Sequence, residues 1–324
     1  MRDKDLAMKD KLVTVFGGSG FVGRYAAQAL LRAGARARFA ERDPRRAFHL
    51  KMLGGLGQTQ FVAADITRPD TVARAVEGAD VVVNLVGVFG REMGRVHVDG
   101  ARAVAEAAAR AGAEALVHVS ALGADPQSPS IYGRTKGEGE DAVRTAFPAA
   151  TILRPSTVFG QEDQFLNRFA QLIARLPVVP VLRPNVRFQP VFAADVGEAI
   201  RAAAADPKRH GGRTFELGGP DRLSMLELQR WIAETIHRRP SFMELPDAMG
   251  ALIARAGFLP GAPITTDQWL MLQKDNVVAE DAPGLDSLGI TPTPLDTVAP
   301  AWLVRFRRRG RFERRPAHTA DLSA

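Results

Sequence analysis

The chain has 324 residues, 46% hydrophobic and 24% charged, a composition typical of a globular protein. It contains no cysteine, which excludes disulfide scaffolds, thiolate zinc sites, iron–sulfur clusters and cysteine nucleophiles. No run of about 18 apolar residues could cross a bilayer as a helix, and the charged N-terminal segment MRDKDLAMKD does not resemble a secretory signal.

The net charge of +7 is concentrated at one end of the chain. Seven arginines and one glutamate lie between Arg305 and Arg315, so this segment carries six of the seven excess charges. A nearly neutral body with a basic tail argues against a DNA-binding domain. The remaining alternatives for the tail are docking to a partner or an anionic membrane, a solvated terminus, and nucleic-acid binding. Trp302, Phe306 and Phe312 lie in and beside the basic run and favour docking.

Strands and helices alternate along the first half of the chain. The pattern predicts strands at 11–16, 36–40, 59–63, 80–86, 115–120 and 150–154, and helices at 21–33, 98–111 and 132–146, with a short helix after 65–70. Because these strands are apolar throughout, they predict a parallel sheet covered on both faces, the doubly wound α/β class.

The pattern changes after Arg154, where prolines become frequent and the strand and helix signals become short and mixed. We expect a dinucleotide-binding domain over 1–158, with 187–205 returning to it. A smaller mixed lobe is expected over 159–304, followed by a basic C-terminal tail over 305–324.

A glycine-rich loop joins the first predicted strand to the first predicted helix. It consists of Gly17, Gly18, Ser19, Gly20, Phe21, Val22 and Gly23, a G-x-x-G-x-x-G pattern. Glycine allows a tight turn, close helix–strand packing and the approach of backbone N–H groups to a pyrophosphate. The position of the loop therefore predicts dinucleotide binding.

The residues after the second strand bear on the choice of nucleotide. Glu41 lies 18 positions after Gly23, where an acidic side chain would accept a hydrogen bond from a free ribose 2′-hydroxyl and favour NAD. Arg42 follows directly, and a guanidinium would pair with a 2′-phosphate and favour NADP. The sequence leaves NAD(H) and NADP(H) as open alternatives.

Tyr132 and Lys136 form a Y-x-x-x-K pattern on a predicted helix. The spacing of four places both side chains on one face. A nearby ammonium group favours phenolate, so Lys136 is expected to lower the pKa of Tyr132 and make it usable as an acid or base. Ser120 ends the preceding strand and could hydrogen-bond the same reacting oxygen.

Together these residues resemble the short-chain dehydrogenase/reductase superfamily, in its extended or atypical branch. The resemblance implies that Ser120 positions the substrate, Tyr132 exchanges a proton and Lys136 holds the nicotinamide ribose. It also implies cofactor contacts that continue along the chain. These contacts would come from Asp65 and Ile66 at the adenine, from Leu85, Val86 and Gly87 along the cofactor, and from Pro155 beside the nicotinamide.

Further segments narrow the resemblance. VVVNLVG at 81–87, RPSTVFGQEDQFLNRFA at 154–170, QPVFAADVGEAI at 189–200, TTDQWLMLQKDNVV at 265–278 and PGLDSLGITPTPL at 283–295 occur in a characteristic order. The chain resembles the nucleotide-binding accessory subunit family of respiratory complex I over nearly its whole length. This resemblance implies a bound nicotinamide nucleotide that supports structure or assembly rather than turnover. It also implies complex I partners and a cytoplasmic protein that is peripheral on the inner face of the respiratory membrane.

The sequence departs from the family patterns at two places and leaves one alternative function open. The extended branch usually has an asparagine in the helix after the fourth strand, where this chain has His97-Val98-Asp99-Gly100. Glu41 is acidic where the complex I subunits tend to have a non-acidic residue. The six histidines show no metal-binding spacing, so no metal site is expected. Because Ser120, Tyr132 and Lys136 are all present, the alternative is an active NAD(P)-dependent oxidoreductase, epimerase or dehydratase. Its substrate would be a nucleotide sugar or a quinone-like carbonyl.

Overall fold

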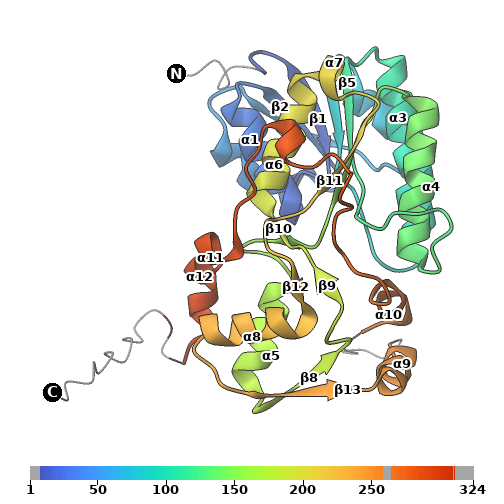
Figure 1. Ribbon diagram of the computed structural model, residues 1–324. Coiled ribbons are helices and arrows are strands. Elements are labelled where there is room, and N and C mark those ends of the chain that lie inside the picture. Colours follow the sequence, from blue (N-terminus) through green and yellow to red (C-terminus); the bar gives the residue numbers. More distant parts are fainter. Residues whose placement is uncertain (1–7, 258–263, 309, 311–324) are drawn as a thin grey trace.

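The computed structural model describes residues 8–257, 264–308 and 310, and its centre is a seven-stranded sheet (Figure 1). The strands follow the order β11-β6-β5-β4-β1-β2-β3, and every neighbouring pair is parallel. The strands are β1 (Leu12–Phe16), β2 (Arg36–Glu41), β3 (Thr59–Ala63), β4 (Val81–Asn84), β5 (Ala115–Val119), β6 (Thr151–Pro155) and β11 (Thr214–Leu217). This confirms the doubly wound α/β class.

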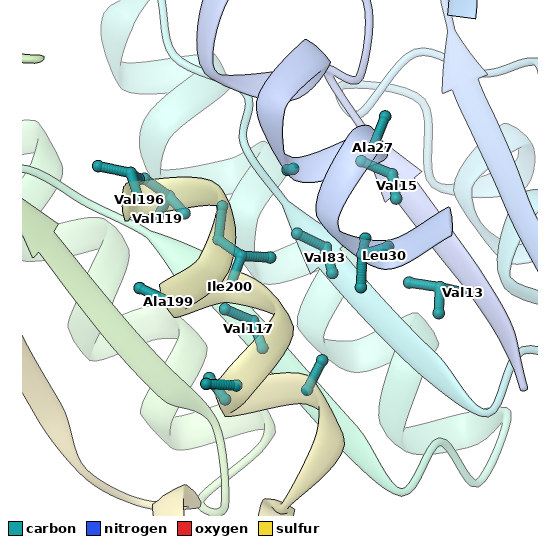
Figure 2. Packing of buried hydrophobic residues seen from close by; sticks show 14 of the residues in the cluster. Val13, Val15, Ala27, Leu30, Val83, Val117, Val119, Val196, Ala199 and Ile200 are labelled. Atoms are coloured by element: carbon teal, nitrogen blue, oxygen red, sulfur yellow. The ribbon is translucent and has the colours of Figure 1, made fainter. Parts of the chain in front are cut away.

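Helices cover both faces of the sheet. On one face lie α1 (Phe21–Arg32) and α6 (Ala193–Ala205), and on the other lie α2 (Pro69–Val76), α3 (Ala101–Arg110) and α4 (Ile131–Ala146). Figure 2 shows Leu30 of α1 and Ile200 of α6 packed over Val83 and Val117 of the sheet. The neighbouring strand residues Val82 and Leu116 pack on the opposite face. Burial on both faces explains why these strands are apolar throughout.

Short segments connect these elements. The 3-10 segment η2 (Pro44–Leu53) joins β2 to β3, and α7 (Pro207–His210) precedes β11. The π-helical turn η3 (Arg95–Gly100) leads directly into α3. Turns of this kind are rare and occur frequently at functional sites.

A smaller lobe lies below the sheet in Figure 1 and is built from short elements. Three two-stranded sheets pair β7 with β10, β9 with β12 and β8 with β13. The strands are β7 (Val158–Phe159), β8 (Val178–Leu182), β9 (Arg187–Phe188), β10 (Val191–Phe192), β12 (Leu223–Ser224) and β13 (Ser241–Leu245). The helices are α5 (Leu166–Arg175), α8 (Met225–Thr235), α9 (Asp247–Arg255), α10 (Thr266–Met271), α11 (Leu295–Val298), α12 (Pro300–Leu303) and η5 (Val304–Phe306). Between α10 and α11 the chain forms η4 (Asp286–Leu288), which lies on the sheet.

The chain crosses between the two regions more often than the sequence indicated. Within the expected return 187–205, α6 does cover the sheet, whereas β10 pairs with β7. In addition, β11 joins the sheet beside β6. Leu285 and Leu288 bring η4 into the same core as α1 and α6. The domain limits 1–158, 159–304 and 305–324 stay a proposal. Within the described part of the chain, no helix is both long and apolar enough to cross a membrane.

Candidate functional site

The glycine loop lies at the carboxyl end of β1 and opens helix α1. Gly17 has a φ of +80°, a left-handed conformation that favours glycine. A Cβ built on Gly23 would lie 2.4 Å from the carbonyl oxygen of Gly17, so only glycine allows α1 to pack this closely on the loop. No side chain caps the first turn of α1, and that turn has no acidic residue. Its free N–H groups and the positive end of the helix dipole suit a pyrophosphate.

Glu41 and Arg42 lie in different surroundings, one against the loop and the other exposed. Glu41 lies at the carboxyl end of β2, and its Oε1 accepts a hydrogen bond of 2.7 Å from the backbone N–H of Ser19. The structure thus places a carboxylate directly against the loop. Arg42 is exposed.

The other residues expected at the cofactor lie along the same edge of the sheet. The backbone N–H of Val86 donates to Asn84 Oδ1 at 3.1 Å, and a Cβ on Gly17 would lie 3.3 Å from Leu85. Asp65 accepts two hydrogen bonds from Thr67. Burial opposes its charge, but these bonds and the nearby arginines outweigh burial and lower its pKa.

Ser120 and Lys136 meet at the end of β5. Lys136 Nζ donates to the carbonyl oxygen of Val119 at 2.9 Å, next to Ser120. Burial lowers the pKa of Lys136 to about 8, and the charge of Glu140 opposes this shift. The Ser120 hydroxyl is buried and has no hydrogen-bond partner among the described residues. Such an orphaned group suits a site that a cofactor or substrate completes.

Tyr132 does not have the predicted electrostatics. Burial raises the pKa of Tyr132 to about 12, so its phenol stays protonated and neutral. The expectation that Lys136 lowers this pKa is therefore wrong, since desolvation alone sets the direction of the shift. The Tyr132 ring stacks on Phe89, with centroids 4.7 Å apart and planes at 15°. Phe89 thus covers one face of the ring.

His97 lies beside Tyr132 and is held by two hydrogen bonds. Its Nε2 accepts a hydrogen bond of 3.0 Å from the backbone N–H of Val88, so the proton of the neutral ring lies on Nδ1. Nδ1 then donates to Thr135 Oγ1 at 2.9 Å. Burial, with a smaller contribution from the positive charge of Lys136, lowers the pKa of His97 to about 4. A neutral His97 therefore joins the loop after β4 to helix α4. It meets the Tyr132 ring edge to face, with centroids 5.5 Å apart.

Two residues of the smaller lobe also support the site. Asp267 of α10 accepts the backbone N–H groups of Ile131 and Tyr132, at 2.5 and 3.2 Å, and so caps α4. Asn276 Oδ1 accepts hydrogen bonds from Ser156 Oγ at 2.7 Å and from the backbone of Thr157 at 2.9 Å. Both residues lie in the 265–278 segment. No local spacing signal could have assigned these contacts, because each spans more than a hundred residues.

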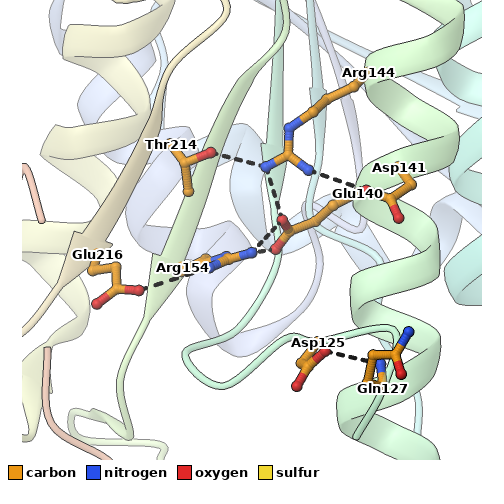
Figure 3. Close-up of polar contacts among 8 residues, drawn as sticks. All are labelled: Asp125, Gln127, Glu140, Asp141, Arg144, Arg154, Thr214 and Glu216. Atoms are coloured by element: carbon orange, nitrogen blue, oxygen red, sulfur yellow. Dashed lines mark hydrogen bonds and ion pairs between the residues drawn. The ribbon is translucent and has the colours of Figure 1, made fainter. Parts of the chain in front are cut away.

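A buried ionic network supports α4 one turn after Lys136 (Figure 3). Glu140 is 1% exposed and accepts two hydrogen bonds of 2.8 Å from Arg154 of β6. Arg144 donates to Glu140 at 3.0 Å and to Thr214 Oγ1 of β11 at 2.9 Å. Glu216 lies 3.7 Å from Arg154. Arg154 is therefore directed at α4, while its neighbour Pro155 ends β6. Within the described residues, no cluster of His, Asp and Glu could hold a metal ion.

The parallel sheet, the glycine loop at its first crossover and the Tyr–Lys helix beside Ser120 define a nicotinamide-dinucleotide-binding protein of the short-chain dehydrogenase/reductase type. The model of the NAD dependent epimerase/dehydratase family matches residues 13–218. The chain belongs to this family, and it is an atypical member related to the subunit-9 proteins of mitochondrial NADH dehydrogenase.

The names of the relatives describe both a subunit of NADH dehydrogenase and reductases. NADH dehydrogenase (ubiquinone) 1 alpha subcomplex subunit 9 of Rattus norvegicus is 38% identical over 305 residues, which cover 91% of this chain and 80% of the relative. A ceramide reductase of Caulobacter vibrioides is 33% identical over 261 residues, 78% of this chain and 80% of the relative. The NADP(H) complex of Citrobacter sp. triphenylmethane reductase has a TM-score of 0.74 at 17% identity. It covers 90% of this chain and 99% of that chain, and it shows the same fold.

Neutralising Glu140 is expected to destabilise the site helix. In Glu140→Gln the buried carboxylate that accepts from both Arg154 and Arg144 is lost, so the free energy of unfolding should fall by about 3 kcal/mol in urea titrations. Glu106→Gln is the matched control, because Glu106 forms an exposed pair with Arg110 one turn apart. It should change stability by less than about 0.5 kcal/mol. Equal losses in the two variants would contradict a special role for the buried network.

The phenol of Tyr132 should remain protonated well above its ordinary range. The chain has two tyrosines, so Tyr25→Phe leaves Tyr132 as the sole source of phenolate absorbance. We expect the folded variant to titrate near 12, and the urea-unfolded variant near the ordinary value of about 10. Because the folded state holds this proton more tightly, its stability should fall as the pH rises from about 10 toward 12. A folded-state midpoint at or below 10 would show that Lys136 controls the phenol after all.

Proposed function

We propose that this protein is a dinucleotide-binding structural or assembly subunit of respiratory complex I, the NADH:ubiquinone oxidoreductase. The observation that carries the proposal is the similarity to the NADH dehydrogenase subunit, which extends over 91% of the chain and so includes the smaller lobe. The model of the epimerase/dehydratase family, by contrast, matches only residues 13–218. This similarity implies that the partners are other subunits of complex I.

The bound group is NAD(H) or NADP(H), which supplies hydride chemistry when a substrate is present. The N–H groups of residues 17–23 would bind its pyrophosphate, and Glu41 with Arg42 would face the adenosine ribose. Asp65 and Ile66 would contact the adenine, while Leu85, Val86 and Gly87 line the cofactor. Lys136 would hold the nicotinamide ribose beside Pro155. The open space around Gly20, whose added Cβ would meet only the Gly17 carbonyl, supports this fit.

The state of Tyr132 supports a structural role over turnover. A phenol with a pKa near 12 is a poor proton exchanger at neutral pH, since efficient acid–base groups titrate near the working pH. For the enzyme alternative, the orphaned Ser120 hydroxyl would bind a carbonyl oxygen, the nicotinamide would supply the hydride and Tyr132 would give the oxygen a proton, while Lys136 would hold the nicotinamide ribose. The ceramide reductase relative favours this second candidate.

The protein is proposed to lie on the inner, cytoplasmic face of the respiratory membrane, partly through its basic end. Part of that end is already used within the fold. Arg307 donates from Nε and Nη2 to the carbonyl oxygen of Thr235, at 3.2 and 2.9 Å, and so caps the end of α8. Arg305 donates to Gln161 at 3.4 Å. Docking to a partner or to anionic lipid would fall to the remaining arginines up to Arg315, most of which lie outside the described residues.

Tyr132→Phe separates the two candidate functions. Each variant would be expressed as the full chain in cells that lack the native protein, and complex I would be purified from their membranes. A structural subunit should keep nucleotide affinity and its place in complex I after this substitution, because the phenol makes no hydrogen bond to the described residues. An enzyme should lose turnover.

Gly20→Asp places a carboxylate at the pyrophosphate position and should abolish nucleotide binding by calorimetry. A wild-type chain that is absent from purified complex I would refute the proposal.

Glu41 should act against NADP. Its carboxylate lies at the ribose end of the loop and would repel a 2′-phosphate, whereas Arg42 can pair with one. In Glu41→Gln we expect the ratio of NADP to NAD affinity to rise by about tenfold, whichever nucleotide the wild type prefers. Titration calorimetry with both nucleotides measures this ratio. An unchanged ratio would place the 2′ position away from Glu41.

A further inference from the structure

The segment 44–57, between β2 and β3, exposes large apolar side chains on a basic surface. Phe48 is 53% exposed, Met52 90% and Leu56 fully exposed. Residues 42–57 contain four basic residues and one acidic residue, and Arg45, Arg46 and Lys51 are all exposed. Single exposed apolar residues are ordinary on protein surfaces. Three of them within nine residues, surrounded by positive charge, indicate a contact surface. We call residues 44–57 the β2–β3 surface.

The β2–β3 surface is held in place from beneath. Its first part is the 3-10 segment η2, in which every third residue lies on the same side. Ala47 and Leu50 are fully buried in the core beside α1, and Leu53 packs against that core. Asp43 caps the segment through the backbone N–H of Arg45 at 3.2 Å. Because the buried side is fixed, Phe48 and Met52 are directed outward by a packed element.

The surface continues into an edge of the sheet. β3 is the last strand in the order, and among the described strands it pairs only with β2. An edge strand leaves backbone N–H and C=O groups that another protein chain can satisfy. Lipid offers no regular partner for such groups, so the edge favours a protein over a bilayer as the occupant.

We propose that the β2–β3 surface docks a protein partner whose own surface is apolar at its centre and acidic at its rim. The inference rests on the proposed function, so the partner is a neighbouring subunit of complex I. Met52 and Leu56 supply the apolar contact area. Arg45 already pairs with Asp43 within this chain. Arg46 and Lys51 pair with carboxylates of the partner around this area, which is how charge complementarity fixes register at an interface.

The same surface rests on the nucleotide loop through three phenylalanines. Phe48 meets Phe61 edge to face with centroids 5.3 Å apart, and Phe61 stacks on Phe39 at 5.6 Å. A Cβ built on Gly18 would lie 2.5 Å from the Phe39 ring, so this ring directly supports the loop. Nucleotide affinity therefore reports whether the support beneath the surface is intact. A variant that keeps this affinity has lost only what Met52 and Leu56 contact.

The test uses the full chain with Met52→Asp and Leu56→Asp combined. Both side chains are exposed, so the double variant should fold and bind nucleotide within about twofold of the wild type. Its recovery in complex I purified from native membranes should fall by about tenfold, as expected for loss of central apolar contacts. The matched control combines Met52→Leu with Leu56→Met, keeps the surface apolar and should assemble normally. Arg46→Glu with Lys51→Glu should weaken assembly and alter its dependence on salt.

Three outcomes would overturn the inference. Wild-type recovery of the Met52→Asp, Leu56→Asp variant would show that the surface makes no contact that assembly needs. If this variant instead loses binding to vesicles of phosphatidylcholine and phosphatidylglycerol that the wild type binds, the occupant is a membrane. If the wild type itself is missing from complex I, the proposed function fails and the docking inference fails with it. If the wild type is present in complex I and the double variant is recovered equally well, only the docking inference fails.

Discussion

All seven strands of the central sheet run in the same direction, and the site depends on this constraint. In a parallel sheet every carboxyl end lies on one edge, so the residues that follow successive strands meet there. The glycine loop follows β1, Glu41 ends β2, Asp65 follows β3, Leu85 follows β4, and Ser120 follows β5. Residues from distant parts of the chain thus form one binding edge without any direct signal between them. Helix α4 then brings Lys136 to the same edge through its bond to Val119.

The sequence predicts what depends on local pattern. The buried strands, the glycine loop and the Tyr–Lys helix all have periodicity or spacing that follows from backbone geometry, and the structure places them as expected. The roles assigned to the site residues stay proposals. The sequence does not predict contacts between residues far apart in the chain, such as Asp267 at the start of α4 and Asn276 at Ser156. A capping carboxylate has no recognisable pattern when its helix lies more than a hundred residues away. The return of η4 to the core is hidden for the same reason.

The electrostatics of the site could not be predicted because they depend on solvent access. Spacing alone places an amine near a phenol and suggests that the amine lowers the phenol's pKa. The fold removes water from both groups, and desolvation moves each of them toward its neutral form. The pKa of Tyr132 therefore rises while the pKa of Lys136 falls, to about 12 and about 8. His97 shows the same effect, and its neutral ring can accept a hydrogen bond from Val88 only because it is uncharged.

The supports of α4 make the dinucleotide site and the smaller lobe parts of one structure. Asp267 caps the first turn of the helix from α10, and the Glu140–Arg154 pair fixes the helix against β6. Asn276 joins the segment after β6 to the smaller lobe. A motion of that lobe relative to the sheet would leave N–H groups of α4 without their carboxylate, at a cost of about 1 kcal/mol or more for each cap lost. Enzymes that close over their substrates draw their moving parts from weakly attached segments. Attachment at several polar positions, most of them partly buried, instead favours a fixed shape, which is what an assembly subunit presents to its neighbours.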